Sequence, residues 1–163
     1  MRRLALLLTL LPLLPSPALG QGAGPSAAHG RPDAFCNGLR QLVGAAASGF
    51  DYLPRDSRLL PGSIEERRGI TRSGDGPPRA VFYAVMLREA AREGPNPAAA
   101  RFRTLQAEIT RCLPDAQAAP AAEGQGGAVA RWSLPTAIVG LRRDDGAGFA
   151  SSMEVEVSVA PRW

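Results

Sequence analysis

The 163-residue chain contains no lysine, one histidine and two cysteines. The histidine, His29, lies in a Gly- and Pro-containing stretch without apolar periodicity, which excludes a serine triad and metal sites built from clusters of histidine and cysteine. The glycine patterns of phosphate loops and dinucleotide-binding turns are also absent, as is a Gly-x-Ser-x-Gly elbow. The sequence therefore predicts no catalytic residue, no metal ligand and no cofactor.

The basic residues are all arginine, nineteen in total, against fifteen acidic residues. No basic run is longer than two residues, so the pI near 10.0 reflects the near-permanent charge of arginine rather than a concentrated positive field. Without Arg2 and Arg3, which belong to a candidate leader, the net charge falls to +2. This balance argues against a nucleic-acid partner, which binds through concentrated basic patches.

The start of the chain has the three parts of an export signal. Arg2 and Arg3 supply the charge, Leu4–Leu14 form the apolar run, and Ala18 and Gly20 are the small residues before a cleavage site. Prolines interrupt the run before it reaches the roughly 20 apolar residues that a membrane anchor needs. We therefore expect a bacterial signal peptide over the first twenty residues and a periplasmic or secreted protein, with no membrane anchor after cleavage.

Two helices are predicted from apolar spacing and from residues that start and stop helices. Apolar residues recur at helical spacing from Asp33, a candidate N-cap, to a stop at Gly49. The second helix is predicted from Asn96, a cap followed by Pro97 at the first helical position, to a stop at Pro114. Each helix has one apolar face to bury.

The two cysteines lie on these apolar faces, Cys36 on the first and Cys112 on the second. An even number of cysteines in an exported chain favours a disulfide. The alternative, a reactive thiol with a histidine partner, would need His29, which lies before the predicted domain. We expect one bond between Cys36 and Cys112 that ties the two helices together.

Short segments rich in Val, Ile, Phe and Tyr predict strands, and turn formers between them predict hairpins. The cluster at 73–78 predicts one hairpin and the acidic, glycine-containing run at 144–148 another. Segment 88–95 fits a strand, a loop or a helix. The predicted strands are Phe50–Tyr52, Arg68–Arg72, Ala80–Leu87, Thr136–Arg142 and Met153–Ala160.

The order of these elements predicts a single α+β domain over 33–163, after a signal peptide at 1–20 and a disordered lead-in at 21–32. We expect an antiparallel sheet of four to five strands with two helices packed on one face and linked by the disulfide. Segment 115–130 is low-complexity Ala, Gly, Gln and Pro, and is expected to be a loop.

A candidate binding surface combines Trp132, Arg142, Arg143 and Trp163. Tryptophan is enriched at protein contacts, and paired arginines can bind an anionic partner. The alternatives are that each tryptophan covers the edge of the core, which its average burial favours, and that acids neutralise the neighbouring arginines.

Two classes of function are compatible with these residues. The first is a non-catalytic binding or protein-interaction module with an envelope protein as its partner, recognised through a sheet edge or through the Arg–Trp surface. The second is a small envelope hydrolase, which needs only two well-placed carboxylates that no motif identifies here. The oligomeric state is not predicted.

Overall fold

The computed structural model describes residues 32–54, 57–72, 76–91, 94–124, 126–146 and 152–162. The predicted leader, almost all of the predicted lead-in and Trp163 lie outside the described residues.

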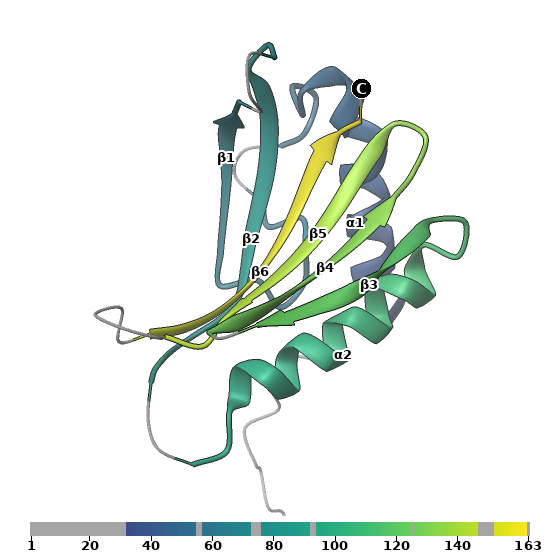
Figure 1. Cartoon of the computed structure of the whole chain (residues 1–163). Coiled ribbons are helices and arrows are strands. Elements are labelled where there is room, and N and C mark those ends of the chain that lie inside the picture. Colours follow the sequence, from purple (N-terminus) through teal and green to yellow (C-terminus); the bar gives the residue numbers. More distant parts are fainter. Residues whose placement is uncertain are drawn as a thin grey trace, which may run out of the picture.

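The described chain forms two helices, one short 3₁₀ helix (η1) and six strands (Figure 1). The elements are α1 (Pro32–Ala45), η1 (Ala46–Ser48), β1 (Glu65–Thr71), β2 (Arg79–Ala90), α2 (Pro97–Cys112), β3 (Gln117–Gly124), β4 (Gly127–Ser133), β5 (Ala137–Asp144) and β6 (Ser152–Pro161).

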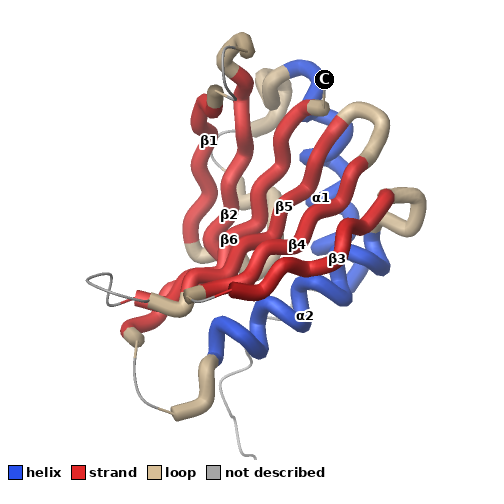
Figure 2. The backbone as a smooth tube through the Cα atoms, viewed as in Figure 1, coloured by secondary structure: helices blue, strands red, loops and turns tan. Residues whose placement is uncertain are grey.

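The six strands form one antiparallel sheet in the order β1-β2-β6-β5-β4-β3. The chain makes the β1–β2 hairpin first and then a meander from β3 to β6, so β6 returns to the middle of the sheet and pairs with β2. Figure 2 shows the strands as a strongly twisted layer with the helices packed against it, as expected for a sheet that buries one face. Both helices contact β5 and β6 and each other.

Both helix predictions are confirmed, except that α1 begins at Pro32, so Asp33 lies in its first turn and is not its N-cap. Asn96 accepts a hydrogen bond from the Ala99 amide at 2.9 Å, and Pro97 occupies the first turn of α2. The first helix ends in η1, and Gly49 follows it in the left-handed conformation (φ 68°) that glycine adopts without strain. Gly38 faces Leu59, whose carbonyl oxygen would lie 2.0 Å from an added Cβ, so only glycine allows this loop to approach α1.

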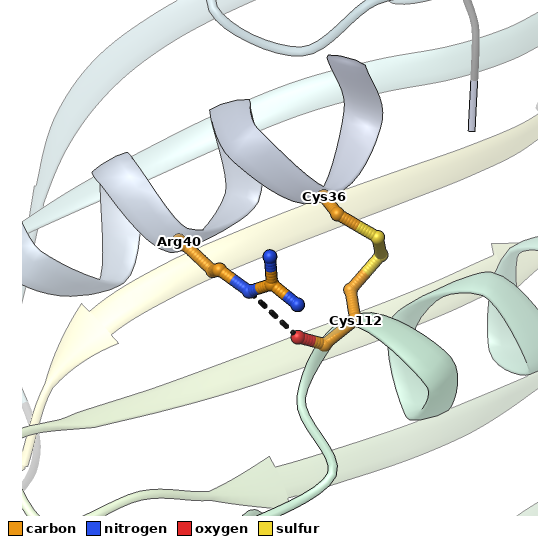
Figure 3. Close-up of a disulfide and its surroundings, with 3 residues drawn as sticks. All are labelled: Cys36, Arg40 and Cys112. Atoms are coloured by element: carbon orange, nitrogen blue, oxygen red, sulfur yellow. Dashed lines mark hydrogen bonds between the residues drawn. A yellow bond between two sulfur atoms is a disulfide. The ribbon is translucent and has the colours of Figure 1, made fainter. Parts of the chain in front are cut away.

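The disulfide between Cys36 and Cys112 joins the start of α1 to the end of α2 (Figure 3). The two Cα atoms lie 4.9 Å apart, and both cysteines are buried. Arg40 adds a hydrogen bond from its Nε to the Cys112 carbonyl oxygen at 3.1 Å. The bond closes a loop of 76 residues, and the chain-entropy model assigns such a loop about 4 kcal/mol of stabilisation.

The prediction of a loop over 115–130 is wrong. Gln117–Gly124 forms β3 and Gly127–Ser133 forms β4, which raises the number of strands to six. All eight residues of β3 are exposed, so neither face of this strand needs apolar side chains and its sequence shows no apolar alternation. In β4 the buried positions alternate, but two of them are alanines that resemble their low-complexity surroundings.

The strand predicted at Phe50–Tyr52 is also wrong. These residues form a turn, in which Phe50 has a φ of 67° and donates its amide to the Ala45 carbonyl oxygen at 3.0 Å. The Phe50 ring is fully buried, with its centroid 6.1 Å from that of Phe82, whereas Tyr52 is exposed. The alternation therefore reflects one ring packed into the core rather than a strand.

The other strand predictions are confirmed, with longer strands than expected. β1 and β2 pair antiparallel, as the predicted hairpin requires, although residues 73–75 of that turn lie outside the described residues. The last two strands form the β5–β6 pair. Strand β2 continues to Ala90, so the start of the undecided segment 88–95 is a strand.

Candidate functional site

The two faces of the sheet differ in what covers them. One face packs under α1 and α2 and contributes most of the apolar core. The other, which we call the helix-free face because neither helix of the described residues covers it, carries Glu154, Glu156 and Ser158 of β6. Successive side chains of a strand point to opposite faces. The charged side chains of β6 therefore lie on the helix-free face.

A hollow of about 720 Å³ lies on the helix-free face. We call it the arginine hollow because four arginines and one acid, Glu156, line it. Its apolar lining comes from side chains of four strands. The arginines are Arg67, Arg79, Arg131 and Arg142, and the apolar residues include Val81, Val129, Ile138 and Ala160.

The strand register explains why the hollow forms at this place. One row of paired residues crosses five strands of the sheet, in the order Arg67, Tyr83, Ser158, Gly140 and Arg131. The large side chains lie toward the two ends of this row, and its middle contains only a serine and a glycine. The hollow therefore has small residues at its floor and an arginine at each end.

Glu156 is the central charge of the hollow, and its side chain is only 7% exposed. Arg67 of β1 reaches across β2 to donate from Nη2 to Oε2 of Glu156 at 2.7 Å. The Arg67 guanidinium lies 4.5 Å from the centroid of the Tyr83 ring, which places a cation over an aromatic face. On the other side, Nε of Arg142 lies 3.9 Å from Oε1 of Glu156.

The ion pairs continue along the face as one chain of alternating charges. Arg142 also lies near Glu154, with 3.8 Å between Nη2 and Oε1. Arg88 then joins Glu154 and Glu65, each at 2.9 Å, and the hydrogen bond to Glu154 is the main reason why the pKa of Arg88 is raised above its usual value. Because an arginine with a raised pKa stays charged throughout the working pH range, Arg88 adds no pH dependence.

The guanidinium groups around Glu156 remain accessible although they are paired. The side chains of Arg67 and Arg142 are 52% and 53% exposed. An arginine has five N–H donors, so one carboxylate leaves several of them for a second acceptor. Arg131 is exposed and makes no ion pair with the described residues.

The three described residues of the candidate Arg–Trp surface do not lie on one face of the sheet. Trp132 is 2% exposed in the core and donates from Nε1 to Thr110 of α2 at 3.1 Å. Arg143 lies on the same side as the helices, over the Phe102 ring and paired with Asp145. Only Arg142 lies in the arginine hollow, and Trp163 is outside the described residues.

The site predicted from the sequence does not include Arg67, Arg79, Arg131 or Glu156. Each looks like an ordinary charged position of a strand with a solvated face. The available signal was the alternation of β6, which places Glu156 among apolar neighbours. The sequence did not show that β6 pairs with β2 and β5, and this pairing brings the arginines of β1 and β5 to Glu156.

A smaller hollow of about 430 Å³ lies beside β1, but its polar side chains already hold the adjacent loop. The Glu66 carboxylate accepts hydrogen bonds from the amides of Leu59 and Leu60 and from the Ser63 hydroxyl. Arg68 donates to the carbonyl oxygens at 53 and 54. We therefore interpret this hollow as the structural closure of the loop.

The free edges of the sheet are less suited to pairing with a partner strand. β3 contains Pro120, and its register with β4 shifts between Ala119 and Ala122. A proline and a bulge both interrupt the ladder that an added strand would need. At the other edge, β1 begins with four charged residues, Glu65–Arg68.

Comparisons with protein-family models, with curated proteins and with solved structures find no match for this chain. Within the described ranges, His, Cys, Asp and Glu form no group of three or more that could hold a metal ion. No helix in the described part of the chain has the length and apolarity that a bilayer crossing requires. The disulfide indicates an oxidising, non-cytoplasmic compartment.

Proposed function

We propose that this protein is a non-catalytic binding module of the cell envelope, and that its arginine hollow binds an extended acidic segment of another envelope protein. The observation that carries the proposal is the charge of the hollow, which is lined by four arginines and one acid. Complementary charge both attracts an acidic partner and selects against a basic one.

The ion-pair chain supports this proposal because it holds Arg67, and less closely Arg142, in place before a ligand arrives. Glu156 is buried and fixes Arg67, which also lies against Tyr83. A side chain that is already ordered loses less conformational entropy on binding. The exposed halves of Arg67 and Arg142 are then oriented donors for carboxylates.

The dimensions of the hollow favour an extended peptide. Arg67 on β1 and Arg131 on β4 are separated by four strand-to-strand steps, or roughly 19 Å. An extended chain covers that distance in about six residues. A segment with acidic side chains about six residues apart would reach both arginines, and its apolar side chains would contact Val129 and Ile138 between them.

A hydrolase with two facing carboxylates is a weaker match to the same surface. Glu156 is the acid that lines the hollow among the described residues, and both of its oxygens face arginines. Glu154, the next acid on this face, is paired with Arg88 and Arg142. Neither carboxylate is placed to work with a second, unpaired one.

The test is a binding measurement on the purified, oxidised protein. The probe is a fluorescent ten-residue peptide with Glu at every second position and Leu or Ser between, and the control peptide has Lys in place of Glu. We expect the acidic peptide to bind at least about tenfold more tightly than the basic one, and to weaken as salt screens the charges. Anisotropy at low and high salt measures both effects.

Matched variants locate the binding on the protein. Arg67→Gln and Arg79→Gln should each weaken the binding of the acidic peptide. Arg103→Gln, which changes an exposed arginine on α2, should leave this binding unchanged. Equal affinity of the wild type for the two peptides contradicts the proposal. A loss of acidic-peptide affinity in Arg103→Gln as large as in Arg67→Gln and Arg79→Gln also contradicts it. Binding to phosphatidylglycerol vesicles without binding to the acidic peptide would replace the proposed partner by an anionic membrane.

A further inference from the structure

We infer that Arg131, Arg142 and Ser158 form the subsite that binds one carboxylate of the acidic segment, in the space above Gly140. This inference rests on the proposed function and specifies which part of the hollow recognises the ligand. It follows from the register, from the ion pairs and from the missing side chain at Gly140.

The register places the two arginines next to each other on the helix-free face. Arg131 of β4 pairs with Gly140 of β5, and Arg142 is two residues further along β5. Diagonal neighbours of this kind have their Cα atoms about 7–8 Å apart, within reach of long side chains. Two like charges at this separation repel each other, and an anion between them would relieve the repulsion.

The ion pairs leave these two arginines freer than Arg67. Arg142 approaches Glu154 and Glu156 only at 3.8 and 3.9 Å, whereas Arg67 contacts Glu156 at 2.7 Å. Arg131 has no acid partner among the described residues. Both guanidinium groups can therefore turn toward a ligand carboxylate without breaking a short ion pair.

Gly140 and Ser158 provide the space and a further donor. A Cβ added to Gly140 would lie 2.6 Å from the Ser158 hydroxyl oxygen, so that hydroxyl lies over the glycine. Ser158 makes no side-chain hydrogen bond with the described residues, which leaves its O–H available to a carboxylate oxygen. Arg131, Arg142 and Ser158 thus line the hollow together with Gly140, a position that has no side chain of its own.

The first arm of the experiment changes the charge of the subsite. Arg131→Gln should lower the affinity for the ten-residue acidic peptide roughly tenfold, which is the effect of one lost charge-assisted hydrogen bond. Arg131→Lys keeps the charge without the planar fork and should recover part of the affinity. Arg103→Gln, at the exposed position on α2, is the matched control and should bind as the wild type does.

The second arm fills the space. In the double variant Gly140→Ala with Ser158→Ala, the new methyl group would lie 4.0 Å from Cβ of residue 158, an ordinary van der Waals contact. The double variant should fold with an unchanged circular dichroism spectrum and bind the acidic peptide at least about tenfold more weakly. Ser158→Ala alone removes one hydrogen-bond donor and should lower the affinity for the acidic peptide only a few-fold.

The outcomes separate this inference from the proposed function. If the wild type binds the acidic peptide and Arg67→Gln weakens it, but Arg131→Gln and the double variant bind normally, the subsite lies elsewhere and the inference is overturned. If the wild type does not bind the acidic peptide at all, the proposed function fails first. Loss of binding in both arms, with folding intact and the Arg103→Gln control unchanged, supports the subsite.

Discussion

The two faces of β6 carry different kinds of side chain, apolar on one face and mostly charged on the other, and the two kinds alternate along the ten residues of the strand. Val155, Val157 and Val159 are fully buried against the helices and the core. Glu154, Glu156 and Ser158 point the other way, onto a face without a helix. Apolar packing stabilises the first face, and charges held in place by one another make the second available for binding. The predictions below separate stability on one face from recognition on the other.

The largest effect is expected on the helix-covered face. Phe102→Ala removes a ring that is 1% exposed in the core, and should lower the free energy of unfolding by about 3–5 kcal/mol. Urea denaturation followed by circular dichroism measures the change. The neighbouring, exposed Arg103→Gln is the control and should stay within about 0.5 kcal/mol of the wild type.

The disulfide should have the next largest effect. Replacing Cys36 and Cys112 together by alanine should lower the free energy of unfolding by about 2–4 kcal/mol, because the unfolded chain gains the freedom of an open loop. Urea denaturation of the variant and of the reduced wild type measures the loss. Two free thiols in the denatured, unreduced protein would show that the bond does not form.

A smaller effect is expected from Glu156→Gln on the helix-free face. Glutamine keeps an acceptor oxygen for Arg67 but removes the charge, so the free energy of unfolding should fall by about 1 kcal/mol. Affinity for the acidic peptide should rise, because one competing negative charge is gone. Glu123→Gln, on the exposed edge strand, is the control for net charge. Weaker binding by Glu156→Gln would contradict this account of the hollow.

Arg131→Gln should have the smallest effect on stability. This arginine is exposed and makes no ion pair with the described residues. The free energy of unfolding of the variant, measured by thermal denaturation, should therefore lie within about 0.5 kcal/mol of the wild-type value. A variant that keeps its stability and loses acidic-peptide binding separates recognition from folding. A marked loss of stability would instead assign Arg131 a structural role.

Local signals in the sequence predicted much of the helix-covered side. Asn96 and Gly49 mark helix ends because caps satisfy backbone groups within a few residues. Apolar spacing placed Cys36 and Cys112 on inner faces, which was enough to expect their bond. Strand β3 could not be predicted in this way, because none of its side chains is buried and its pairing with β4 is a property of the backbone.

The candidate site was predictable only in part. Arg142 was identified, but Arg143 and Trp132 point toward the helices, since neighbouring residues of a strand face opposite sides. The partner of Arg142 is Glu156, from another strand, and Arg67 comes from a third. No local pattern links residues that are 89 positions apart, as Arg67 and Glu156 are.

The sequence by itself determined the two helices, the Asn96 cap and the Gly49 stop, the disulfide and the alternation of the last strand. Each of these depends on residues a few positions apart or on a single pair of cysteines. Only the tertiary structure decided that β6 returns to the centre of the sheet between β2 and β5. That placement brings arginines of β1 and β5 to one buried glutamate, in a hollow that arginines of β2 and β4 also line. The physical reason is that strand order depends on long-range pairing of backbones, which local side-chain patterns do not encode.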